Sequence, residues 1–148
     1  YGSLDELKMA LFEGGHTVAN HSYTHPSFLS LSREDALSEI ERTQTLLSEI
    51  FPEIVLPYFR PPFGYRKRET FEAAATLGLE VVGGETNSLD FLDGCPTRLA
   101  RRVQGEVSPN SIVLFHDGRE KRNVTAKALP KLLEWLKASG YPTYNAQP

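Results

Sequence analysis

The sequence predicts an α/β fold in which helices alternate with short parallel strands. Stretches with apolar residues at helical spacing alternate with short apolar runs along the whole chain. Glycines and helix-capping residues fall between these stretches, and no internal repeat or low-complexity tract interrupts them. Alternation of this kind implies parallel strands joined by crossover helices, in an open sheet or a β/α barrel.

Five helices are predicted from their start and stop signals. Ser3 and Glu6 have capping-box spacing, and Ser32 precedes a long stretch with an apolar stripe. Gly78 and Gly140 stand where two of the helices should stop. The expected helices cover residues 3–13, 32–50, 67–77, 97–107 and 124–139.

Five strands are expected between these helices. Residues 112–115 form the clearest one, a continuous apolar run after a turn. The others are expected at residues 17–19, 55–59, 79–82 and, more weakly, 142–144. In parallel α/β folds the active site lies at the carboxyl ends of the strands, so polar clusters at these ends are the first candidates.

The composition describes an ordinary globular domain. The chain has 148 residues, a net charge of −3 and 40% hydrophobic residues, which suits one domain over residues 1–148 with a real core. The negative net charge does not indicate binding to nucleic acid, and no apolar run is long enough to span a membrane. Cys95 is the single cysteine, so neither internal disulfides nor a cysteine zinc cluster supports the fold.

The first polar cluster is His21-Ser22-Tyr23-Thr24-His25, after the expected strand 17–19. Histidines four residues apart can place both imidazoles on one side of a turn, which suits zinc or a similar divalent ion. Two loop histidines without a metal would give the same pattern, so the spacing alone leaves both interpretations open.

The second cluster is Arg60-Pro61-Pro62-Phe63-Gly64, at the end of the expected strand 55–59. The prolines stiffen the loop, which allows a backbone N–H to face a developing oxyanion. Arg60 can orient a carboxylate through its planar guanidinium. Alone, this segment is better explained as a proline turn beside a surface arginine.

Two further clusters follow later strands. Asn87 to Phe91 contains Asp90, which can orient a histidine, and Leu114 to Asp117 contains His116, which can act as a general acid. Nearby Asp93 is expected to be a solvated loop acid. Each signal is weak alone, but polar clusters at successive strand ends indicate one shared site.

Together these motifs resemble the polysaccharide deacetylases with a NodB homology domain, carbohydrate esterase family 4. The segments 14–26, 60–64, 87–91 and 112–117 are similar to the second to fifth motifs of that family, in order and spacing. The resemblance implies a distorted (β/α) barrel. It also implies hydrolysis of acetyl groups on a polysaccharide such as peptidoglycan or chitin oligomers, or on acetylated xylan.

The resemblance also assigns roles to single residues. His21 and His25 would bind the metal, zinc or another first-row divalent ion such as cobalt. Arg60 would position the catalytic base, and His116 would be the general acid with Asp90 as its orienting carboxylate. The remaining residues would form the oxyanion loop (Pro62, Phe63 and Gly64) and the wall of the acetyl pocket (Phe91 and Leu114).

This sequence departs from the family pattern in two ways. Phe91 and Asn87 stand where tryptophan and aspartate are common in the fourth motif, which is expected to shift substrate preference. More importantly, the family's first motif carries adjacent aspartates, the base and the third metal ligand, and no Asp-Asp pair occurs here. The chain begins at Tyr1 rather than Met. We therefore expect a barrel incomplete at its N-terminus, which a separate N-terminal polypeptide could complete, and no activity from this segment alone.

Three functions remain open. The leading expectation is an extracytoplasmic deacetylase acting on an acetylated glycan, with no nucleic-acid partner and no membrane insertion in this segment. A metal amidohydrolase of the same fold could instead act on a small cyclic amide or ureide. A non-catalytic glycan-binding relative could have lost the Asp-Asp motif, although glycan binding alone does not require His21, His25, Arg60, Asp90 and His116 together.

Overall fold

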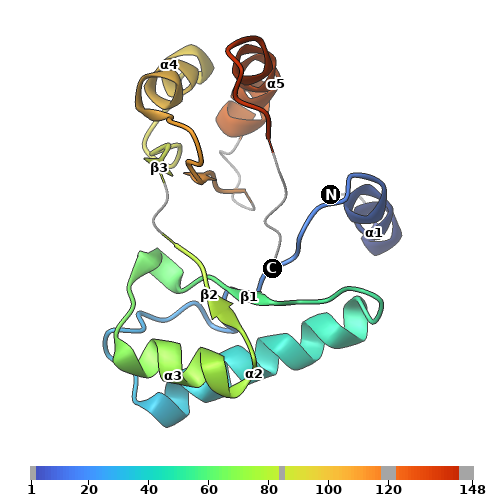
Figure 1. Cartoon of the computed structure of the whole chain (residues 1–148), viewed down its shortest axis with the longest axis vertical. Coiled ribbons are helices and arrows are strands. Elements are labelled where there is room, and N and C mark those ends of the chain that lie inside the picture. Colours follow the sequence, from blue (N-terminus) through green and yellow to red (C-terminus); the bar gives the residue numbers. More distant parts are fainter. Residues whose placement is uncertain (1–2, 84–85, 118–122, 144–148) are drawn as a thin grey trace. The chain divides into compact units, whose positions relative to one another are not determined.

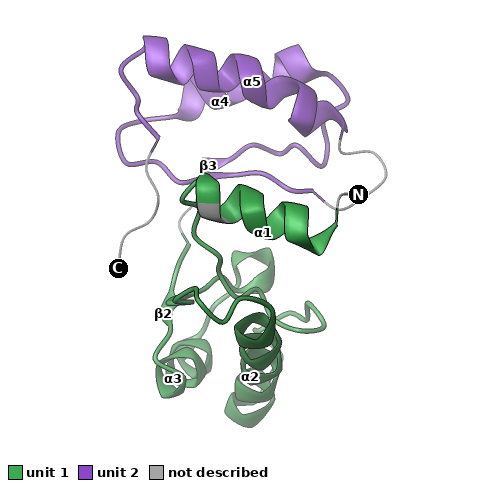
Figure 2. Cartoon of the chain, turned by 90° about the vertical axis from the view of Figure 1, so that its right-hand side faces the viewer, with its two compact units in different colours: residues 1–83, 145–148 green, residues 84–144 purple. Residues whose placement is uncertain are grey.

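The chain folds into two compact units, each built around one β-α-β motif. The structure is a computed structural model that describes residues 3–83, 86–117 and 123–143. Unit 1 comprises the described residues up to Gly83, and unit 2 comprises those of the segment 84–144. Figure 2 shows unit 1 in green and unit 2 in purple.

Unit 1 begins with two helices that the sequence caps. Ser3 and Glu6 make the reciprocal capping-box bonds of α1 (Leu4–Glu13), from Ser3 N to Glu6 Oε2 and from Glu6 N to Ser3 Oγ. Ser32 caps α2 (Arg33–Ile50), since its hydroxyl oxygen accepts the N–H of Asp35. Both starting points match the expectation from sequence.

The β-α-β motif of unit 1 follows α2. Its elements are β1 (Tyr58–Phe59), the 3-10 turn η1 (Pro62–Gly64), α3 (Arg68–Thr76) and β2 (Glu80–Val81). The two strands pair in parallel, with Tyr58 opposite Glu80. Gly78 ends α3 with a φ of +69°, a conformation that glycine adopts without strain.

The core of unit 1 lies between its two-stranded sheet and two helices. Helices α2 and α3 lie side by side beneath β1 and β2 (Figure 1). Phe28 and Phe59 are fully buried there, with their ring centroids 5.2 Å apart, and pack against Ile40 of α2 and Ala73 of α3. This packing fixes β1, and with it the loop that begins at Arg60.

Unit 2 repeats the same local plan. Its elements are β3 (Thr86–Asn87), α4 (Pro96–Glu106), β4 (Val113–Leu114) and α5 (Asn123–Ala138), and β3 pairs in parallel with β4. Helices α4 and α5 lie side by side and bury Val103, Leu132 and Leu136 (Figure 1). Phe115, directly after β4, packs against this cluster and anchors the segment that carries His116.

The parallel β-α-β arrangement confirms the predicted α/β class, but a closed barrel is not what the described residues show. They form two separate two-stranded sheets. The strand expected at 17–19 is wrong: the structure has only a single parallel bridge, between Asn20 and Phe59. The expected strand 142–144 is also wrong for residues 142 and 143, which are irregular, while Tyr144 lies outside the described residues.

One strand was missed. The strands expected at 55–59, 79–82 and 112–115 are present, but each is only two residues long in the structure (β1, β2 and β4). The missed strand is β3, which lies where a loop motif was expected. The two residues of β3 are too few to show a periodic pattern in the sequence. The strand that precedes the Asp90 loop is β3, not β2.

In the part of the chain that the structure describes, no helix combines the length and the apolar character that crossing a membrane requires.

Candidate functional site

The loop that carries His21 and His25 begins at a buried polar residue, Asn20. Asn20 is fully buried, and its backbone bridges to β1 through bonds to Tyr58 O and from Arg60 N, both 2.9 Å. Its side-chain amide donates to Ile40 O (2.8 Å) and to Gln44 Oε1 (3.1 Å), and its Oδ1 accepts from Ser22 N (3.0 Å). Every hydrogen-bonding atom of Asn20 therefore has a partner. These bonds fix the backbone at Asn20, and with it the position of the next residue, His21.

Two partners fix the tautomer of His21. Its Nδ1 lies within hydrogen-bonding distance of the Arg60 carbonyl oxygen, which can only accept, so Nδ1 carries the proton. Its Nε2 lies 3.4 Å from Arg60 Nη1, which can only donate. Nε2 therefore presents a lone pair, the form in which imidazole binds a metal while its other nitrogen bonds a carbonyl.

His25 faces His21 from the other end of the turn. The two ring centroids are 5.0 Å apart and the rings nearly perpendicular, and His25 makes a similar edge contact with Phe63 at 4.9 Å. Ser22 and His25 both have left-handed backbones, with φ of 68° and 60°. Such a backbone costs a non-glycine residue roughly 1–2 kcal/mol, so this turn is held by its contacts rather than by local preference.

The Arg60–Gly64 loop follows β1 directly. Pro61 and Pro62 are buried, while Phe63 is 60% exposed and has a left-handed backbone with a φ of 59°. Gly64 N donates to Pro61 O, whereas the N–H of Phe63 donates to none of the described residues. A donor of this kind on a stiff loop is what oxyanion stabilisation requires.

Glu39 of α2 contacts the same histidine loop. Its carboxylate accepts the N–H groups of Tyr23 (3.0 Å) and Thr24 (2.8 Å) and the Thr24 hydroxyl (2.9 Å). Partial burial raises the pKa of Glu39, but the bonds from Thr24 and Tyr23 outweigh this, so its pKa lies below the ordinary value. Glu39 therefore binds the loop as a carboxylate.

In unit 2, Asp90 and His116 form a hydrogen-bonded pair. Asp90 Oδ1 lies 2.8 Å from His116 Nδ1, and Oδ2 accepts both the His116 N–H (2.7 Å) and the Thr125 hydroxyl (2.8 Å). Burial raises the pKa of Asp90, whose side chain is fully buried, but these bonds outweigh that effect and lower its pKa. An ionised Asp90 orients the imidazole through its bond to Nδ1. Phe91 packs edge-on against His116, with centroids 5.5 Å apart.

Asp93 is not the solvated loop acid that the sequence indicated. Its side chain is 1% exposed and forms ion pairs with Arg98 (2.9 Å) and Arg102 (3.1 Å) of α4. The hydrogen bond from Arg98 is the largest cause of its lowered pKa. Arg102 also donates to Ser88 O (2.9 Å), so the two arginines fix both ends of the Asp90 loop.

The donor set fits a zinc ion in part. Two neutral imidazoles that face each other are suitable ligands, and the His21–Arg60 carbonyl bond is the outer contact that metal-binding histidines commonly make. Among residues 3–83, 86–117 and 123–143, no group of three or more histidine, cysteine or acidic side chains lies close enough together to hold a metal. His21 and His25 can therefore supply two ligands, and at least one more has to come from elsewhere.

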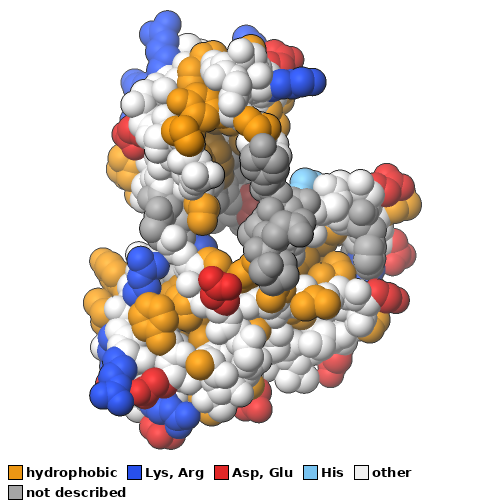
Figure 3. Space-filling model, in the orientation of Figure 1, with side chains coloured by type: hydrophobic (Ala, Val, Ile, Leu, Met, Phe, Trp, Pro, Cys, Tyr) orange, Lys and Arg blue, Asp and Glu red, His pale blue; other side chains and the backbone are white. Residues whose placement is uncertain are grey.

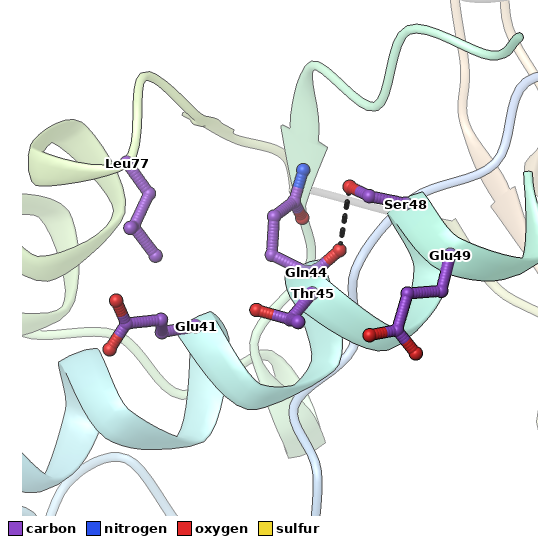
Figure 4. A pocket seen from close by; sticks show the side chains of 6 residues that line it. All are labelled: Glu41, Gln44, Thr45, Ser48, Glu49 and Leu77. Atoms are coloured by element: carbon purple, nitrogen blue, oxygen red, sulfur yellow. Dashed lines mark hydrogen bonds between the residues drawn. The ribbon is translucent and has the colours of Figure 1, made fainter. Parts of the chain in front are cut away.

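A shallow hollow on unit 1 belongs to none of these groups. It lies on the surface of α2 and is lined by Glu41, Gln44, Thr45, Ser48, Glu49 and, beside α3, Leu77 (Figure 4). The Ser48 hydroxyl there donates to the Gln44 carbonyl within the helix. On the face drawn in Figure 3, acidic and basic side chains are interspersed on both units.

Comparison with known proteins places this arrangement in a family. The model of the family described as polysaccharide deacetylase matches residues 3–82, which is more than half of the chain. The chain belongs to the polysaccharide deacetylase family.

Relatives with assigned activities and solved structures agree with this. A peptidoglycan-N-acetylglucosamine deacetylase of Bacillus cereus is 30% identical over 91% of this chain and 63% of its own length. A family 4 carbohydrate esterase from Streptomyces lividans, solved with acetate, is 30% identical with a TM-score of 0.78, over 91% of this chain and 68% of that one. The chain thus spans about two thirds of the length of these two polysaccharide deacetylase relatives.

One structural neighbour is a pseudoenzyme. This protein of the same carbohydrate esterase family, from Bacillus anthracis, is 27% identical with a TM-score of 0.85, over 96% of this chain and 48% of that one. A mutant of it has restored enzymatic activity. The polysaccharide deacetylase family therefore includes at least one member that kept the fold without the activity.

The structure brings the predicted site residues together in two groups. His21, His25, Arg60 and Phe63 cluster in unit 1, and Asp90, Phe91 and His116 cluster in unit 2. Leu114 lies in β4, two residues before His116. The catalytic and metal-binding roles of these residues stay predictions.

Sequence reasoning missed several supporting residues. They are Asn20, Glu39, Arg98, Arg102 and Thr125. Asn20 stands directly before the histidine pair, and Thr125 lies in the first turn of α5. Neither residue is part of a sequence pattern that indicates which residue it contacts. The arginines have a weak signal, because Arg98 and Arg102 are spaced to share one face of a helix that follows Asp93.

Proposed function

We propose that this chain carries the histidine part of a metal-dependent deacetylase site that removes acetyl groups from a polysaccharide. Zinc, or another first-row divalent ion, would be held by His21 and His25 together with a third ligand. The substrate would be an N-acetylated glycan such as peptidoglycan or chitin oligomers, or an O-acetylated one. The resemblance to peptidoglycan deacetylases supports a location outside the cytoplasm.

The observation that carries this proposal is the state of His21. Its Nδ1 donates to a backbone carbonyl and its Nε2 keeps the lone pair, while the ring of His25 stands 5.0 Å away. Two loop histidines without a metal would not need a fixed tautomer or a turn with two left-handed residues. The cost of this geometry supports a functional interpretation.

The chemistry of the other residues is consistent with amide hydrolysis. The bound metal would polarise the acetyl carbonyl and lower the pKa of a water molecule. The Phe63 N–H lies on a stiff loop and would stabilise the oxyanion, and the Asp90–His116 pair would deliver a proton to the leaving amine. Phe91, which is 49% exposed beside His116, offers an apolar wall for the acetyl methyl group.

The base and the third metal ligand are not assigned to any residue here. No adjacent aspartates occur in the sequence, and the relatives extend beyond the aligned segment. We propose that these acids are supplied by polypeptide outside the 148 residues, whether part of the same protein or separate, and that Arg60 orients the base.

The direct test combines zinc binding with deacetylation. The longest natural form of the protein would be titrated with zinc against a chromophoric chelator and assayed on N-acetylated chitooligosaccharides and peptidoglycan fragments. His21→Ala and His25→Ala should each abolish tight zinc binding and activity. His116→Ala should leave zinc binding unchanged and lower turnover. Equal zinc affinity in the wild type and the His21→Ala variant would overturn the metal assignment.

A non-catalytic role is the second candidate. Two observations favour it: the chain has no adjacent aspartate pair, and a pseudoenzyme lies among its structural neighbours. It predicts glycan binding without acetate release, even with zinc present. The two candidates are separated by acetate measured after incubation of the zinc-loaded protein with acetylated glycan.

A further inference from the structure

We propose that Glu39 of α2 is a positioning residue that fixes the backbone of residues 23–25, so that His25 faces His21. This inference rests on the proposed function for the identity of the metal, but not for the contacts themselves. Glu39 belongs to no motif singled out in the sequence, and it lies in the helix rather than in the loop.

Glu39 uses both carboxylate oxygens on the loop. Oε2 accepts the N–H of Tyr23 at 3.0 Å and that of Thr24 at 2.8 Å, while Oε1 accepts the Thr24 hydroxyl at 2.9 Å. Bonds from N–H groups to an ionised acceptor are stronger than bonds between neutral groups. One side chain thus bonds to two consecutive backbone amides and the hydroxyl beside them.

Apart from the bonds to Glu39, the backbone N–H groups of the loop bond only to acceptors within the loop and its first residue, Asn20. The N–H groups of residues 22 to 25 all have acceptors: Ser22 donates to Asn20, Tyr23 and Thr24 donate to Glu39, and His25 donates to the Ser22 hydroxyl. The residues at both ends of this run, Ser22 and His25, are left-handed. Glu39 therefore supplies the middle pair of bonds in a turn that local preference does not favour.

A second side chain of α2 contacts the same loop independently. The Arg42 guanidinium lies 3.8 Å from the centroid of the Tyr23 ring. Arg42 is three residues after Glu39, so both project from the same side of the helix. The loop is therefore attached to α2 at Tyr23 through its backbone and its ring.

The position of His25 depends on these contacts. Its ring has edge contacts with His21 and Phe63, and the preceding residue is Thr24, the residue that Glu39 binds twice. A displacement of Thr24 would move the His25 ring away from His21. Loss of Glu39 should consequently weaken metal binding more than it weakens the fold.

Glu39→Gln is the sharpest variant. A carboxamide keeps the size of the side chain but presents one acceptor oxygen, and its NH2 group would face donors of the loop. Glu49→Gln is the matched control, because it removes the same charge from an exposed position ten residues further along α2, about 15 Å away. Figure 4 shows Glu49 beside the shallow hollow on α2.

Two readouts would be measured on the longest natural form of the protein. Zinc affinity would come from competition with a chromophoric chelator, and the amide exchange of Tyr23 and Thr24 would be followed in the metal-free protein. For Glu39→Gln we expect zinc affinity to fall roughly 10–100-fold, as for the loss of other outer contacts of a metal site. Exchange at both amides should accelerate, and Glu49→Gln should behave as the wild type in both.

The outcomes separate this inference from the proposed function. Accelerated exchange with unchanged zinc affinity would make Glu39 merely structural and overturn the inference. If the wild type does not bind zinc, the metal assignment fails, and unchanged exchange in Glu39→Gln would then also overturn the role of Glu39. Should Glu39→Gln not fold, Thr24→Val removes only the hydroxyl donor, and it should weaken zinc binding several-fold while the fold persists.

Discussion

The two units hold their candidate-site loops with hydrogen bonds of opposite direction. In unit 1 the loop donates, and Glu39 of α2 accepts from Tyr23 and Thr24. In unit 2 the loop accepts, since Asp93 takes bonds from α4 arginines and Asp90 takes one from Thr125 of α5. A helix carboxylate thus supports the loop in unit 1, whereas helix donors support the loop in unit 2.

The residue at the centre of each group differs in charge. Asn20, which precedes His21, is a neutral amide, whereas Asp90, which binds His116, is an ionised carboxylate. A histidine that binds a metal has to be neutral, and one that donates a proton has to be protonated. The Asp90 carboxylate bonds the His116 ring directly, whereas the Asn20 amide bonds Ile40, Gln44 and Ser22 and holds His21 only through the backbone. Exchanging the two central residues tests the comparison.

The largest effect is expected from Asp90→Asn. Asparagine keeps the volume but cannot accept from His116 Nδ1, the His116 N–H and Thr125 together as the carboxylate does. We expect turnover of acetylated chitooligosaccharide to fall about 10²–10⁴-fold, the range for loss of a general acid or of its orienting group. Zinc affinity should not change. Undiminished turnover would remove Asp90 from the mechanism.

The reverse exchange, Asn20→Asp, should act on stability. Aspartate has no hydrogen to donate to Ile40 O or Gln44 Oε1, so a buried charge would face two acceptors. We expect the free energy of unfolding to fall by about 2–4 kcal/mol. Urea denaturation monitored by circular dichroism measures this. Asn123→Asp, an exposed change of the same kind, is the control and should lie near the wild type.

A smaller effect is expected from Thr125→Val, which removes one donor from Asp90 and keeps the shape of the side chain. Asp90 Oδ2 would lose this bond and keep the His116 N–H, so the free energy of unfolding should fall by about 1–2 kcal/mol. Turnover should fall less than in Asp90→Asn, because Oδ1 still bonds His116 Nδ1. Thr125→Ser, which restores the hydroxyl, should recover most of the stability. If it does not, the threonine methyl group contributes to stability as well as the bond.

The sequence predicted the helices well because their signals are local. The capping box at Ser3, the cap at Ser32 and the stop at Gly78 each involve residues within a single turn. The site loops were also found, and those at Arg60, Asp90 and His116 follow the strands β1, β3 and β4 of their own units. Two-residue strands have no period, which explains the missed β3 and the overlong strands.

The supporting contacts could not be predicted for a different reason. Glu39 lies fifteen residues from Thr24 and Thr125 lies 35 residues from Asp90, and only the packing of helix against loop joins them. Asp93 was misjudged because an acid in a polar loop has the same local pattern whether it is solvated or paired with Arg98. Tertiary packing, not composition, decides between these two states.

The difference between the two central residues should also appear as a difference in pH dependence. The folded-state pKa of Asp90 is lowered, so its ionised form adds stability above the unfolded value near ~3.9. That stability is lost as the pH falls through the lower, folded value. Asn20 does not titrate. Between about pH 5 and about pH 2, the protection factor of the His116 N–H, bound to Asp90, should therefore fall.

The Ser22 N–H, bound to Asn20, provides the internal reference for this experiment. Its protection should follow only the general loss of stability, to which Glu39 and Asp93 contribute in the same direction because their pKa values are also lowered. In Asp90→Asn the extra fall at His116 should vanish, because the acceptor no longer titrates. Parallel curves for the two amides in the wild type would mean that both loops are lost in one global transition. The contrast between amide and carboxylate would then have no local consequence.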